Sequence, residues 1–101
     1  MKIAVTYNKG SINKHLGITE QFKIYETDCD KILNNDIVEM EDINPDELIK
    51  FLESIEADVM ICGNVGAAIQ SMFDDSGILL CSGIEGNADE MVSKFLDGEL
   101  I

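Results

Sequence analysis

Apolar and polar positions in the first forty residues alternate in the way that short β-strands do. Residues 2–7 are strand-like, and residues 8–20 are predicted to form a loop. Residues 21–26 alternate with a period of two, which is typical of a half-buried antiparallel strand. The polar stretch 27–35 predicts a turn, and residues 37–40 predict a third strand. The second and third strands are therefore expected to form a hairpin.

The pattern changes to a helical period after residue 43. Asn44, Pro45 and Glu47 form a typical helix start, because they supply an N-cap, a first-turn proline and a reciprocal cap. This helix is expected to extend to about Glu56. The predicted inward positions are Leu48, Phe51, Leu52 and Ile55. Further elements follow in this order: a buried strand at 58–62, a helix at 65–73, a buried strand at 77–81 and a helix from the Asn87 cap to Gly98.

The element order β-β-β-α-β-α-β-α predicts an α/β fold with a mixed five-stranded sheet covered by helices, in one domain over residues 1–101. Strands joined by helices are expected to be parallel, and strands joined by tight turns antiparallel. The loops after strands one, four and five then meet at the carboxyl edge, where open α/β sheets bind ligands. These loops carry His15, then Cys62 with Gly63-Asn64-Val65-Gly66, and then Cys81.

Charge restricts the partners. The formal net charge is −13, and all seven basic residues are lysines, which argues against nucleic acid and against an acidic membrane surface. The apolar run at residues 3–5 is too short for a signal peptide or a spanning helix, so a cytoplasmic location is expected. Three widely spaced cysteines, Cys29, Cys62 and Cys81, are more natural as reduced thiols than as a disulfide framework.

Soft-metal ligation is one interpretation of His15, Cys62 and Cys81, because imidazole and thiolates together suit zinc, copper or iron–sulfur species. Inert packing of the two thiols and a histidine without a role are the alternatives. A closed structural zinc site is disfavoured, because it needs four ligands. Cys29 lies between two aspartates in the predicted hairpin turn and is expected to be a surface thiol.

The turn Gly63-Asn64-Val65-Gly66 joins a strand to a helix, so its backbone amides could face an anion; ordinary turn chemistry is the alternative. No Ser/His/Asp arrangement is recognisable. The first strand ends at Tyr7 and Asn8 rather than at a carboxylate, which disfavours a metal-dependent nuclease. The sequence predicts a protein that is not an enzyme.

Several segments together carry a family resemblance. They are residues 1–5, Gly10, His15-Leu16-Gly17, and residues 22–26, 58–66, 77–78 and 95–100. With these segments the chain resembles the dinitrogenase iron-molybdenum cofactor biosynthesis family, whose members are nitrogenase accessory factor-like. The resemblance implies a three-layer α/β/α ribonuclease H-like motif with strand order 3-2-1-4-5 and the second strand antiparallel. It also implies binding of iron–sulfur or iron–molybdenum cluster precursors; a related orange protein carries a molybdenum–copper sulfide cluster.

In this family the histidine of a His-Phe-Gly triplet is the candidate cluster contact, and His15 occupies the matching place. The leading hypothesis is a non-catalytic carrier that holds a metal–sulfur cluster or precursor. His15, Cys62 and Cys81 are its expected metal ligands, and Gly63, Asn64 and Gly66 its expected backbone contacts. Cluster donor and acceptor proteins are the implied partners. The alternative is a metal-free module that binds a protein or a small anion through the same fold.

Overall fold

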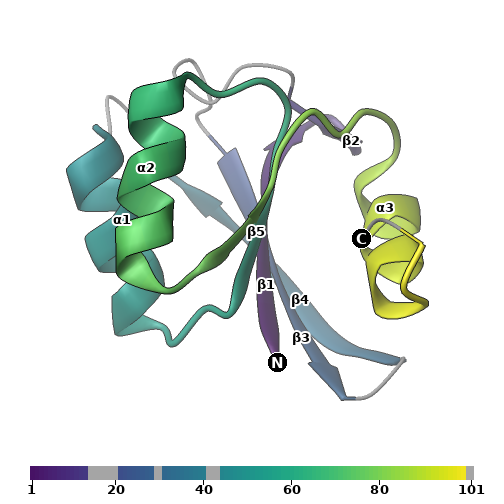
Figure 1. The fold of residues 1–101 in the computed structure, drawn as a ribbon. Coiled ribbons are helices and arrows are strands. Elements are labelled where there is room, and N and C mark those ends of the chain that lie inside the picture. The colour runs from purple at the N-terminus through teal and green to yellow at the C-terminus, as the bar shows by residue number, and fades with distance from the viewer. Residues whose placement is uncertain (14–20, 29–30, 41–43, 100–101) are drawn as a thin grey trace.

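The structure is a computed structural model that describes residues 1–13, 21–28, 31–40 and 44–99. Strands dominate the first part of the chain, and helices alternate with strands in the second (Figure 1). The elements are β1 (Lys2–Asn8), β2 (Ser11–Ile12), β3 (Gln21–Asp28), β4 (Lys31–Glu39), α1 (Pro45–Ser54), β5 (Val59–Ile61), α2 (Ala67–Ser76), β6 (Leu79–Cys81) and α3 (Ala88–Leu96).

The sheet has the strand order β4-β3-β1-β5-β6, and β2 pairs with β1 off this path. β3 is antiparallel to both of its neighbours, whereas β1, β5 and β6 are mutually parallel. This confirms the predicted mixed sheet, its 3-2-1-4-5 order and its antiparallel second strand. The predicted number of five strands is wrong, because the described residues already form a sheet of six.

The additional strand lies within the segment predicted to be a loop. Lys9 and Gly10 have φ angles of 49° and 90°, which form a two-residue turn between the paired residues Asn8 and Ser11. Positive φ at both central positions gives the twist that β-hairpins favour, so the chain folds straight back on β1. The side chain of buried Thr6 supports this return by donating a hydrogen bond to the carbonyl of Asn13, at 3.1 Å.

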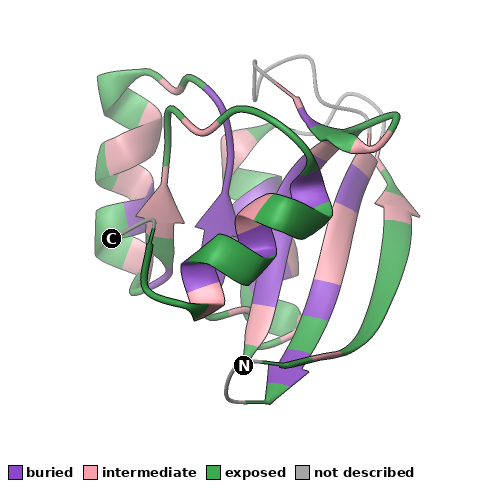
Figure 2. Ribbon diagram, turned by 90° about the vertical axis from the view of Figure 1, so that its right-hand side faces the viewer, coloured by how far each residue is buried: buried purple, intermediate pink, exposed green. Residues whose placement is uncertain are grey.

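The hairpin of β3 and β4 is longer than predicted. The turn expected at 27–35 is wrong, because β3 continues through Asp28 and β4 starts at Lys31. β4 is an edge strand and is exposed along most of its length (Figure 2). Polar residues there cost little, so the alternating pattern is lost. Cys29, predicted to be in this turn, lies outside the described residues.

The helices start close to where their caps predict. The Asn44 and Asn87 side chains accept hydrogen bonds from the amides of Glu47 and Glu90. α1 ends at Ser54, two residues before the predicted end, and α2 covers residues 67–76 rather than 65–73. Gly77, with φ 82°, ends α2, so β6 starts at Leu79 and not at Gly77. Each helix was therefore predicted to within a few residues.

Helices cover the sheet on both sides and make three layers. α1 and α2 pack on one face, and α3 packs on the other (Figure 1). We call these the α1/α2 face and the α3 face. Leu48 and Leu52 point inward as predicted, whereas Ile49 is buried in place of Phe51 and Ile55, which are only partly buried. None of the helices in the described residues is long and apolar enough to cross a membrane.

Candidate functional site

The carboxyl ends of β1, β5 and β6 lie at one edge of the sheet, because these strands are parallel. We call it the carboxyl edge. The loops after β5 and β6 are joined there by three backbone hydrogen bonds: the Cys62 amide donates to the Cys81 carbonyl at 2.9 Å, the Gly83 amide to the Gly63 carbonyl at 2.8 Å, and the Ile84 amide to the Cys62 carbonyl at 3.0 Å. The two loops that carry the predicted thiols therefore lie side by side.

The β1–β2 hairpin joins the same edge. The Ile12 amide donates to the Gly86 carbonyl at 2.8 Å, and the Ala88 amide donates to the Gly10 carbonyl at 3.0 Å. Three loops from distant parts of the sequence thus meet at the carboxyl edge, as the topology predicted. His15, the third predicted metal ligand, lies outside the described residues, so its place relative to this edge stays a prediction.

Cys62 lies beneath this edge, in the core. Its side chain is fully buried in the cluster on the α1/α2 face, with Leu52 and Phe73 among its members. Burial, with a smaller contribution from nearby Cys81, raises the pKa of the Cys62 thiol to about 12. At neutral pH this thiol is protonated and shielded from solvent.

Cys81 has different surroundings. Its register partner on β5 is Ile61, one residue before Cys62. Since successive side chains on a strand point to opposite faces, Cys81 belongs to the α3 face, where it packs at the margin of the cluster that contains Ile61. The Cys81 thiol is half-buried, and burial raises its pKa above the usual value. The two thiols are thus close in the backbone but lie on opposite faces of the sheet.

The turn Gly63-Asn64-Val65-Gly66, which we call the glycine turn, leads from Cys62 into α2. Gly63 is buried, whereas Asn64 and Gly66 are exposed. Gly66 is the N-cap of α2, and no side chain in the described part of the chain caps this helix; its first turn also contains no acid. α1 and α3, by contrast, have Asn caps and two acids each in their first turns. The α2 start is the helix N-terminus best suited to an external anion.

A network that the sequence analysis missed fastens α3 to the sheet. Asp89, in the first turn of α3, accepts hydrogen bonds from Lys23, at 3.0 Å, and from the Tyr25 hydroxyl. Burial and the Asp89 hydrogen bond raise the pKa of Tyr25 above its usual range, and the Tyr25 and Lys23 hydrogen bonds lower the pKa of Asp89. The sequence did contain a signal for this network. Lys23 and Tyr25 are two residues apart and so share one strand face, and Asp89 is an acid at the start of a predicted helix. The network fixes the end of the loop that follows Cys81.

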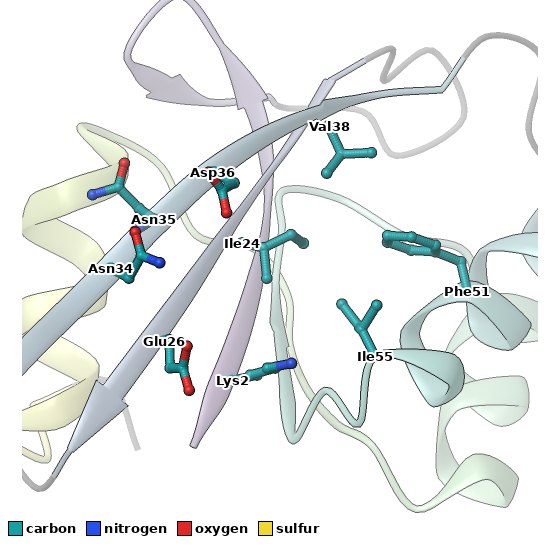
Figure 3. Close-up of a pocket in the computed structure, with 9 residues that line it drawn as sticks. All are labelled: Lys2, Ile24, Glu26, Asn34, Asn35, Asp36, Val38, Phe51 and Ile55. Atoms are coloured by element: carbon teal, nitrogen blue, oxygen red, sulfur yellow. The ribbon is translucent and has the colours of Figure 1, made fainter.

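The described cavities lie away from the carboxyl edge. A cavity of about 220 Å³ opens between α1 and the β3–β4 hairpin (Figure 3). Four apolar side chains converge on it: Ile24 from β3, Val38 from β4, and Phe51 and Ile55 from α1. Another, of about 340 Å³, lies between α1 and α2 and is lined mainly by polar and charged residues. Neither was predicted, since both depend on how α1 packs against distant parts of the chain.

Within residues 1–13, 21–28, 31–40 and 44–99, no group of three or more His, Cys, Asp or Glu side chains is arranged to hold a metal ion. At the carboxyl edge these residues supply one half-buried thiol, Cys81, and the amides that start α2. The predicted set of His15, Cys62 and Cys81 stays a prediction, because His15 lies outside the described residues.

Comparison with known proteins places the chain in a family. The family model described as dinitrogenase iron-molybdenum cofactor matches residues 1–98. This chain belongs to the dinitrogenase iron-molybdenum cofactor family. One relative from this comparison, an uncharacterised protein of Methanocaldococcus jannaschii, is 27% identical over 105 residues, which cover 99% of this chain and 89% of the relative.

Solved structures show the same fold. The crystal structure of a protein named PH0822 matches with a TM-score of 0.89 and 20% identity, over 98% of this chain and 91% of that one. The apo form of the orange protein from Desulfovibrio gigas matches with a TM-score of 0.81 and 21% identity, over 97% of this chain and 88% of that one. The family match thus confirms the resemblance seen in the sequence, and these structures extend it to the three-dimensional fold.

Proposed function

We propose that this protein is a non-catalytic carrier that binds an iron–sulfur or iron–molybdenum cluster, or a precursor of one, at the carboxyl edge. The observation that carries the proposal is the half-buried Cys81 thiol at the carboxyl edge, where three joined loops meet. The start of α2, which no described side chain caps, belongs to the same edge of the sheet. Membership of the dinitrogenase iron-molybdenum cofactor family supports the class of cargo. The ribonuclease H-like classification belongs to the same proposal.

The geometry gives the two thiols different parts. Cys81 can ligate a soft metal after losing its proton, because its side chain reaches solvent. Cys62 is fully buried under the loops that the Gly83–Gly63 hydrogen bond joins. It packs in the core below the edge and would bind a metal only after those loops separate. His15 stays a proposed ligand.

The glycine turn would contact the anionic part of the cargo. Metal–sulfide clusters with thiolate ligands carry negative charge, and the net charge of −13 repels such a group at long range. The amides at the start of α2, with Gly63, Asn64 and Gly66 before them, provide a local positive dipole at short range. Inner-sphere bonds must then supply most of the affinity.

Carrying requires ligand exchange and no change in the protein's own bonds. A donor protein would release the cargo to Cys81, and an acceptor thiolate would later replace Cys81 while that thiol regains its proton. Such exchange needs free thiols, and in the described residues Cys62 and Cys81 are both free. We therefore place the protein in a reducing compartment, the cytoplasm, with cluster donor and acceptor proteins as its partners.

A metal-free anion-binding module is the second candidate. The uncapped, acid-free start of α2 favours it, because an external anion could satisfy those amides without any thiol. The two functions differ in how salt affects binding. Salt screens electrostatic attraction to an anion but leaves coordination bonds intact.

Anaerobic reconstitution tests the proposed function. The protein is incubated with ferrous iron and sulfide, desalted, and examined by metal analysis and visible absorption at several salt concentrations. The carrier proposal predicts a coloured, metal-containing protein whose uptake is unchanged or slightly improved by salt. A colourless protein that refuses reconstitution would contradict it. Tight binding of inorganic phosphate that weakens steeply with salt would favour the second candidate.

A further inference from the structure

The two edges of the sheet differ in how well they are protected from pairing with another strand. β6 ends the sheet on one side and has three residues, whereas β4 ends it on the other and has nine. An edge strand presents unpaired backbone donors and acceptors, and proteins usually protect it by shortness, proline or charge. β6 is short. β4 contains no proline, and between Ile32 and Asn35 it contains no charge.

Two exposed apolar side chains lie on β4. Ile37 is 49% exposed and Leu33 is 62% exposed. Leu33 has no register partner on β3, because the pairing shifts between Glu26 and Thr27 at that point. Ile37 pairs with Lys23, which contacts α3 through Asp89, so Ile37 lies on the α3 face and not on the side of the cavity in Figure 3. Ile37 is thus separate from that cavity, and Leu33 is not among the residues that line it.

The two ends of β4 carry complementary charges when the strand is reversed, and Asp36 would then face the uncharged Asn34. The strand begins with Lys31 and ends with Glu39, and Leu33 and Ile37 stand at equal distances on either side of Asn35. An antiparallel neighbour of the same sequence would bring its Glu39 end to Lys31 and its Ile37 to the region of Leu33. A parallel neighbour would place like charges together. The charge pattern therefore favours a second copy in antiparallel orientation.

We propose that β4 pairs antiparallel with β4 of a second copy of this chain, about a two-fold axis near Asn35, so that two sheets join into one. This proposal is independent of cluster binding, since β4 and the carboxyl-edge loops of β5 and β6 belong to different sides of the sheet. Each copy has a net charge of −13, so long-range repulsion opposes the pairing. Salt also weakens the exposed Lys31–Glu39 contacts, but such surface pairs contribute little. Screening of the repulsion between the two copies should outweigh that loss, so added salt should strengthen the dimer.

Sedimentation velocity over a concentration series, at low and high salt, tests this proposal with two matched variants. Ile37→Lys places a charge in the interface of both copies and should weaken dimerisation by roughly tenfold or more, since each copy loses a cross-strand contact. Leu79→Lys is the control, because Leu79 is 46% exposed on the opposite edge strand. Far-UV circular dichroism establishes that both variants fold.

Amide hydrogen exchange of the unmodified protein provides a second measurement. The backbone amides of β4 that point away from β3, on both sides of Asn35, should gain protection as protein concentration rises, while those of β6 should not change. A monomer at every concentration and salt, or equal weakening by Ile37→Lys and Leu79→Lys, would overturn the proposal. Association without concentration-dependent protection of β4 would do the same, because a different surface would then form the contact.

Discussion

Cys62 follows β5, Cys81 ends the neighbouring parallel strand β6, and the two share a backbone hydrogen bond, yet the sheet gives them opposite environments. Cys62 enters the closed core beneath α1 and α2, and Cys81 lies at the open margin near α3. The difference arises because Cys81 pairs with Ile61 and not with Cys62, and successive side chains point to opposite faces of a sheet. Two cysteines at the same edge of a sheet are therefore not automatically a pair of ligands.

The largest expected effect is in thiol reactivity. With its pKa raised to about 12 and no exposed surface, Cys62 should react with a maleimide at least about a hundredfold more slowly than Cys81 in the native protein at neutral pH. Mass spectrometry of the cysteine-containing peptides over time measures each rate separately. Similar rates for the two thiols would break the comparison.

Substitution of the two cysteines should also change the stability of the protein by different amounts. Cys62→Ser places a hydroxyl group in an apolar cluster, which costs roughly 1–3 kcal/mol of unfolding free energy if the group finds no partner. Cys81→Ser, at the half-buried margin, should cost less than about 1 kcal/mol. Urea denaturation of both variants gives the values. A Cys81→Ser protein as unstable as Cys62→Ser would mean that Cys81 belongs to the core.

The sequence predicted the fold well because its signals are local. Asn44 and Asn87 cap α1 and α3, as expected from their side chains. The strand order follows from which connections are helices and which are turns. The short strand Ser11–Ile12 was missed because two residues give no period. The start of β4 was missed because an edge strand exposed on both faces, as at Asn34 and Asn35, does not alternate.

The candidate site was predicted less completely. The meeting of three loops at the carboxyl edge follows from strand direction, which the sequence supplies. The separation of Cys62 from Cys81 depends on the register of Ile61 with Cys81, which pairs two strands that are joined through α2. No local pattern in residues 58–62 or 77–81 encodes it.

Proton competition should make metal uptake depend on pH. Burial raises the pKa of Cys81, so the proton must be displaced throughout the neutral range, and affinity should rise about tenfold per pH unit for each thiolate formed. The rise should continue beyond the usual thiol pKa of 9.0 and level off only above the raised value. Titrating ferrous iron with sulfide into the protein at several pH values measures the slope. A flat profile would indicate binding without a thiolate.

Metal retention in matched cysteine variants tests the central claim, that the cargo is held at the open side of the carboxyl edge by Cys81. Wild-type, Cys81→Ser and Cys62→Ala proteins are reconstituted anaerobically, desalted, and compared by iron and sulfide content per chain. Alanine is used at position 62 because it adds no polar group to the core. The account predicts that Cys62→Ala keeps its cluster and that Cys81→Ser loses most of it while remaining folded. Full retention by Cys81→Ser, with loss in folded Cys62→Ala, would contradict it.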